Sequence, residues 1–264
     1  VRNSATMVFA GAMLRRVDAD KNATITDGTS NNAITVEELF RSYPALSPFL
    51  LSVLSAGVED VLQTHEGMSM PPIFPILLLL SRAQPVINSG PESAELAQPF
   101  IASVFKSLTL RHHGIRRAAS LALVNLCSGE NKQSQSSASA MLNGCHQLLV
   151  NAVTRRDWNS VHGALLGVKQ IILKFSGTSC LLQESGLENY FISMLRRSKT
   201  RQIWPDLCMS VALEILSGIQ PPPDRRATSR SQVKQICCCL LESLERDCGD
   251  AGGSPELAIT VAKA

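Results

Sequence analysis

The chain has 264 residues and a formal net charge of +3, and it is 45% hydrophobic, 18% charged and 5% aromatic. This apolar fraction is ample for a buried core and excludes a generally disordered chain, while the scarcity of aromatic residues argues against an all-β fold. The longest uninterrupted apolar stretch, near residues 76–80, is far too short to span a bilayer. Because the chain starts with Val1 and has no basic, apolar leader, we expect a piece of a longer protein.

The first predicted helix begins at a capping box. Thr35 and Glu38 have the spacing of that motif, so a helix is expected to start there. Pro44 should end this helix or start the next, which would carry residues 49–62. Four further prolines are expected to interrupt other segments, namely Pro71, Pro85, Pro99 and Pro205.

Clear apolar stripes at helical spacing recur through the rest of the chain. They cover residues 115–126, 161–172 and 233–244. Asp157 is a good N-cap for a helix that continues through Lys174. Three polar stretches are predicted to be flexible loops, namely residues 18–33, 128–139 and 220–231.

These elements add up to about ten helices without a convincing strand, which predicts an all-α fold. Arginine pairs begin at residues 116, 155 and 196, at intervals of 39 and 41 residues. These intervals are close to the period of paired-helix repeats. The sequence therefore predicts an armadillo/HEAT-like α-solenoid of antiparallel helix pairs, with an irregular helical bundle as the main alternative.

Eight cysteines are present, and none forms a C-x-x-C pair. Most lie within runs of leucine, isoleucine and valine, where a free thiol behaves as a small hydrophobic group. We therefore expect buried, reduced thiols and a cytoplasmic or nuclear protein.

The net charge hides an uneven distribution along the chain. Residues 105–210 hold 13 basic and 5 acidic residues, a balance of +8, whereas residues 1–104 have a balance of −4 and residues 211–264 one of −1. Such a basic middle attracts polyanions. The candidate phosphate-binding residues are its arginine pairs, Arg116, Arg117, Arg155, Arg156, Arg196 and Arg197. Solvated helix ends are the plain alternative, because one arginine pair is common on any surface.

One predicted helix, at residues 158–174, has an unusual composition. Gly163 and Gly167 lie one turn apart, which suits close approach by another helix or a partner. Asn159 and His162 share a face and are candidates for partner binding. The alternative is packing within the protein, with His162 as a core residue. No motif for a catalytic set, metal or cofactor is found, so we expect no enzyme activity.

Five ordered blocks resemble the THADA family (thyroid adenoma-associated protein and its fungal relatives). They are RNSATMVF at 2–9, FRSYPAL at 40–46, PIFPILLLL at 72–80, IRRAASLAL at 115–123 and NSVHGALL at 159–166. The resemblance divides the chain into a family-like segment at 1–175 and further helical repeats at 176–264. It adds Arg2, Asn3 and Ser4 to the candidate binding residues.

The resemblance implies a non-catalytic scaffold or regulatory subunit. Members of the family are very long helical-repeat proteins that pair with an FtsJ-like methyltransferase, which 2′-O-methylates the first ribose of the tRNA anticodon loop. The expected partners are therefore that enzyme and tRNA, with no cofactor bound by this chain. A HEAT-repeat protein adaptor unrelated to RNA, of the transport-receptor or tubulin-cofactor type, is the alternative that the residues leave open.

Overall fold

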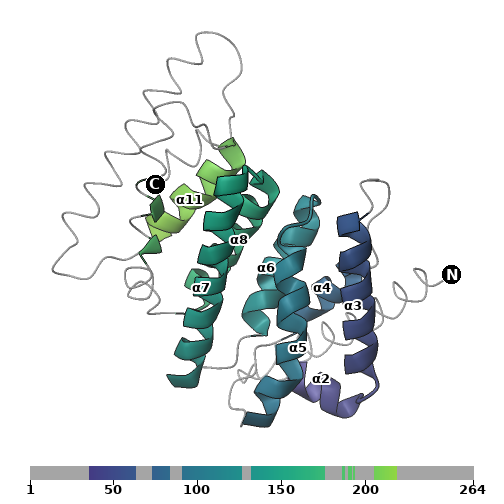
Figure 1. Cartoon of the computed structure of the whole chain (residues 1–264). Coiled ribbons are helices and arrows are strands. Elements are labelled where there is room, and N and C mark those ends of the chain that lie inside the picture. Colours follow the sequence, from purple (N-terminus) through teal and green to yellow (C-terminus); the bar gives the residue numbers. More distant parts are fainter. Residues whose placement is uncertain are drawn as a thin grey trace, which may run out of the picture. The chain divides into compact units, whose positions relative to one another are not determined.

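The structure is a computed structural model that describes residues 36–63, 73–83, 91–126, 132–175, 186–187, 190–191, 193 and 205–218. Within these ranges every regular element is an α-helix, which confirms the all-α prediction. The helices in chain order are α2 (Val36–Ser42), α3 (Leu46–Gln63), α4 (Ile73–Arg82), α5 (Pro91–Ser107), α6 (His113–Asn125), α7 (Lys132–Arg155), α8 (Trp158–Lys174) and α11 (Asp206–Gly218) (Figure 1).

The chain forms two compact units, residues 1–140 and 141–264. The core of the N-terminal unit is built around α4, which packs against α3 and α6. Five of its six aliphatic side chains are completely buried, namely Ile73, Ile76, Leu77, Leu79 and Leu80. A helix that is apolar on nearly all sides is stable only inside a core, and each such side chain contributes about 2 kcal/mol by its burial.

Contacts between helices two apart in the chain reveal a structural repeat. In the N-terminal unit, Ser55 and Ser103 share a hydrogen bond of 3.0 Å across 48 residues, and Lys106 pairs with Glu59 across 47. Because both residue numbers rise together, α3 and α5 run in the same direction, and Figure 1 shows them upright beside each other. The amide of Asn125 donates to Ser81 O at 2.7 Å across 44 residues and so joins α6 to α4.

The C-terminal unit has the same spacing. Lys169 pairs with Glu214 across 45 residues, and the Cys208 thiol donates to Trp158 O at 3.8 Å across 50. In the N-terminal unit the first helices α3 and α5 thus pack on each other, as do the second helices α4 and α6, which is the arrangement of stacked helix pairs in an α-solenoid. Short links between the members of a pair make them antiparallel. The predicted fold class is therefore confirmed.

The helix boundaries with local signals were predicted correctly. The first helix begins at Val36, directly after the capping-box threonine, and α3 begins at Leu46, two residues after Pro44. Asp157 caps α8, because its carboxylate oxygens accept hydrogen bonds from Ser160 N at 3.3 Å and from Ser160 Oγ at 2.5 Å. Pro205 directly precedes α11, as expected of a helix-starting proline.

Two local predictions were wrong. Residues 128–139 were expected to be a loop, yet α7 begins at Lys132. Its first turns are polar in sequence, and its first described buried side chains are those of Ala138 and Met141. Pro99 was expected to interrupt the chain but lies inside α5. The next residue, Phe100, is fully buried, and its ring stacks on that of Phe40 with 5.2 Å between the ring centroids. This packing compensates for the hydrogen bond that the proline cannot donate.

The intervals of 39 and 41 residues between arginine pairs differ from the observed contact spacing of 44–50 residues. The reason is that the pairs occupy different places in their repeats, since Arg116 lies in the first turn of α6 and Arg155 is the last residue of α7. The boundary expected near residue 175 concerns family resemblance and stays a prediction. The predicted stripe at 233–244 and the loops at 18–33 and 220–231 lie outside the described residues.

Candidate nucleic-acid interface

Arg116 is buried beneath the turn that joins α5 to α6. Its side chain is only 4% exposed, and Nη1 donates hydrogen bonds to Leu110 O at 2.7 Å and to Arg111 O at 2.6 Å. These carbonyls follow the C-terminal end of α5, where the helix dipole favours a positive charge. Arg116 therefore fastens the turn to α6, and in this conformation its guanidinium is not available to a phosphate.

The neighbouring Arg117 has the opposite environment. Its side chain is exposed on the first turns of α6, one helical turn after the exposed His113, and Arg111 is exposed in the turn itself. The sequence suggested Arg116 as a phosphate contact, whereas the structure makes it the residue that holds the turn. In the part of the chain that the structure describes, the side chains of Arg111 and Arg117 have no hydrogen-bond or ion-pair partner.

The turn from α7 to α8 carries the second arginine pair, and both Arg155 and Arg156 are exposed. Arg156 adopts a left-handed conformation with φ 58°. Asp157 N donates to Ala152 O at 2.9 Å, and Arg156 N donates to Val153 O at 3.1 Å. Together these bonds form a Schellman motif, in which glycine usually occupies the left-handed position. The arginine there is accommodated at a cost in backbone energy.

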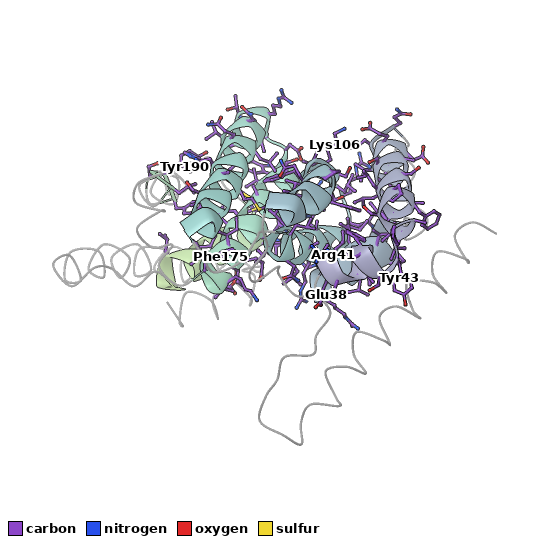
Figure 2. All side chains as sticks on the ribbon, turned by 90° about the horizontal axis from the view of Figure 1, so that it is seen from below. Glu38, Arg41, Tyr43, Lys106, Phe175 and Tyr190 are labelled. Carbon is purple, nitrogen blue, oxygen red and sulfur yellow. The ribbon has the colours of Figure 1, made fainter. Side chains whose placement is uncertain are left out.

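Other described cations mostly have acidic partners or further contacts. Lys106 pairs with Glu59 at 2.5 Å on the α3–α5 layer, and Lys169 pairs with Glu214 between α8 and α11. Arg41 also takes part in an interaction, and Figure 2 shows it on the opposite side of the N-terminal unit from Lys106. Exposed arginine side chains without a partner in the described ranges thus gather at the two turns.

The candidates on α8 lie mainly in the interior. His162 is 2% exposed, and Gly163 and Gly167 are buried, while Asn159 is half-buried. The helix packs against α11 within the C-terminal unit. This placement favours packing within the protein over direct contact of His162 with a partner, and the binding role of Asn159 stays a prediction.

Five candidates lie outside the described residues, namely Arg2, Asn3, Ser4, Arg196 and Arg197. Cys145 and Cys208 are buried free thiols, as predicted for the cysteines within apolar runs. In the described ranges no three His, Cys, Asp or Glu side chains gather where they could hold a metal ion. No helix in those same ranges combines the length and hydropathy that a membrane span requires.

Comparison with known sequences identifies the class. A family model described as Trm732, C-terminal TPR repeats, matches residues 2–171. The THADA protein of dog is 30% identical over 178 residues, which are 67% of this chain and 9% of that protein. The mouse protein is 29% identical over 173 residues, covering 65% and 9%, and the chicken protein 32% over 101 residues, covering 38% and 5%. No solved structure matches the chain significantly.

The stacked helix pairs, with basic turns between the members of a pair, define a helical-repeat protein. Within that class the chain belongs to the family of Trm732 and THADA. The mammalian and avian relatives are each named a regulator of a tRNA (32-2′-O)-methyltransferase. The chain spans about 9% of the length of the mammalian relatives. Arg111 belongs to the same basic cluster of the sequence as Arg116 and Arg117.

Proposed function

We propose that this chain supplies tRNA binding to a non-catalytic regulator of an FtsJ-like methyltransferase, which 2′-O-methylates nucleotide 32 of the tRNA anticodon loop. The relatives' printed names support the reaction and the regulatory role. The observation that carries the proposal for this chain is the set of exposed arginines without acidic partners in the described parts of a segment whose charge balance is +8.

In this proposal the work is divided between the two proteins. The methyltransferase binds S-adenosylmethionine and carries out the methyl transfer, while the regulator holds the tRNA. A guanidinium group suits that task because its planar fork donates to two phosphate oxygens and stays charged at physiological pH. Held in this way, the tRNA stays at a high effective concentration near the enzyme. The buried free thiols fit a reducing, cytoplasmic location for the complex.

The test combines the 264-residue chain, a purified FtsJ-like methyltransferase, a tRNA transcript and S-adenosylmethionine carrying a labelled methyl group. We expect the chain to bind the tRNA with an affinity that falls steeply as salt rises, because phosphate contacts release counterions. We expect label at nucleotide 32 only when both proteins are present. A folded chain that does not bind tRNA at low salt would contradict the proposal and favour the protein-adaptor alternative.

A further inference from the structure

We propose that the turns joining the two helices of a pair form the RNA phosphate-binding surface of this chain, with Arg111 and Arg117 at the α5–α6 turn and Arg155 and Arg156 at the α7–α8 turn. The inference rests on the proposed tRNA binding and assigns it to a place in the repeat. Each turn is considered within its own compact unit, so the assignment requires no particular arrangement of the two units.

The pairing state of the cations is the first argument. Lys106 and Lys169, which lie on the faces of helices, are neutralised by Glu59 and Glu214. The four arginine side chains at the turns are exposed and have no acidic partner in the described part of the chain. In addition, α6 has no acidic residue in its first turn. The α5–α6 turn therefore keeps its positive charge, and at the α7–α8 turn the exposed carboxylate of Asp157 offsets only one of the two arginine charges.

The construction of the α5–α6 turn is the second argument. The buried guanidinium of Arg116 bonds the carbonyls of Leu110 and Arg111 and so fixes the backbone from which the Arg111 side chain extends. Arg117 follows Arg116 directly and is exposed on the same first turns of α6. A fixed backbone reduces the entropy that an arginine side chain loses on binding a phosphate.

The backbone at Arg156 is the third argument. Its φ of 58° lies in the region that glycine adopts without steric cost, and the Schellman hydrogen bonds around it need no side chain. Folding of the turn would therefore be served better by glycine than by arginine. A residue held against its backbone preference indicates a role for its side chain, which we assign to phosphate contact.

The surroundings of the turns favour an RNA backbone over a protein partner. Protein interfaces have an apolar, often aromatic centre. The exposed large apolar side chains of the described part are Phe49, Leu62, Leu173 and Leu207. None belongs to the α5–α6 turn, whereas the α7–α8 turn has the half-buried Trp158 beside it, and Cys208, the neighbour of Leu207, contacts Trp158 O. At the α5–α6 turn, Arg111 and Arg117 have no exposed large apolar side chain beside them in the described part, which suits a phosphate backbone that positions an RNA without reading its sequence.

The experiment measures binding of one tRNA transcript and of a second, unrelated tRNA by the 264-residue chain at several salt concentrations. The variants are the double substitution Arg111→Ala/Arg117→Ala and the single substitution Arg156→Gly. The controls are Lys106→Ala, which removes an ion-paired cation in the first unit, and Lys174→Ala. Lys174 is exposed on the same helix as the α7–α8 turn, but about 25 Å from it at 1.5 Å per residue.

We expect both turn variants to weaken binding of the two tRNAs to a similar degree. They should also flatten the dependence of log affinity on log salt by up to about one unit for each contact removed. Arg156→Gly should weaken binding although its melting temperature rises, which separates the loss from unfolding. The lysine controls should stay within about twofold of the unsubstituted chain.

The experiment distinguishes failure of the proposed tRNA binding from failure of its assignment to the turns. If the unsubstituted, folded chain binds no tRNA, the proposed function fails. If it binds tRNA and the turn variants keep the salt dependence of the lysine controls, the proposed function stands and the assignment to the turns is wrong. If the turn variants bind tRNA as well as the unsubstituted chain but bind an acidic protein ligand less tightly, the assignment is likewise wrong and a protein partner is favoured.

Discussion

Neighbouring arginines of identical chemistry are expected to have opposite effects when each is replaced by alanine. Arg116 is 4% exposed and holds two backbone carbonyls, whereas Arg117 is exposed and holds none in the described structure. Arg116→Ala should therefore destabilise the fold, and Arg117→Ala should weaken tRNA binding without destabilising it. The comparison is well controlled, because the two substitutions remove the same atoms from adjacent positions of one helix.

The expected loss in the free energy of unfolding on Arg116→Ala follows from the two hydrogen bonds of Arg116. A hydrogen bond from a charged donor is worth roughly 1.5–3 kcal/mol, and its loss also leaves a carbonyl to be solvated at the edge of the core. Partial access of water to the turn reduces the sum, so we expect a loss of about 3 kcal/mol in the free energy of unfolding. For a unit of this size such a loss lowers the melting temperature by roughly 6–12 °C. Arg117→Ala should remain within about 0.5 kcal/mol of the unsubstituted chain, as surface substitutions generally do.

The assay is thermal unfolding followed by circular dichroism at 222 nm, combined with tRNA titration at a temperature where all variants are folded. For Arg116→Ala we expect a lower melting temperature and only a partial loss of affinity per folded molecule, because Arg116 holds the backbone that carries Arg111 but does not itself contact the RNA. For Arg117→Ala we expect an unchanged melting temperature and weaker tRNA binding. A melting temperature of Arg116→Ala within about 1 °C of the parent would refute the assignment of Arg116 to the turn.

Three further predictions concern the C-terminal unit. Arg156→Gly should raise the free energy of unfolding by about 1 kcal/mol, because glycine adopts the left-handed conformation at φ 58° without steric strain. Denaturant unfolding would show this gain as a higher midpoint, and a lower midpoint would contradict it. Asp157→Ala should cost about 1 kcal/mol through loss of the cap on Ser160, whereas Asp157→Asn should retain most of it. Burial lowers the pKa of His146 from its usual 6.5, so the folded state binds its proton less readily than the unfolded state. The stabilising contribution of the neutral ring is then present above about pH 6.5 and is lost as the pH falls through the lowered pKa. The fall in melting temperature between about pH 7.5 and about pH 5.5 should therefore be smaller for His146→Leu than for the parent chain. An equal fall in both proteins would exclude His146 as a contributor.

The sequence by itself determined the features that depend on local chemistry. The capping oxygen of Asp157 and the fixed backbone of Pro44 act within a few residues, so the starts of α8 and α3 could be predicted without knowledge of the fold. The apolar stripe of residues 115–126 likewise predicted α6 and most of its buried face. The class of the fold follows from these signals, because such helices can bury their stripes only against one another.

Only the tertiary structure decided which arginine of a pair is buried. Arg116 and Arg117 differ by one residue, about 100° around the helix, and the phase of α6 relative to α4 and α5 sets which of them points inward. The same holds for Pro99, which lies within α5 because packing of the adjacent Phe100 overrides a weak local preference. Local signals determine where a helix begins, whereas its rotation about its own axis is decided by the neighbouring repeat, through contacts between residues 44–50 positions apart that no local pattern contains.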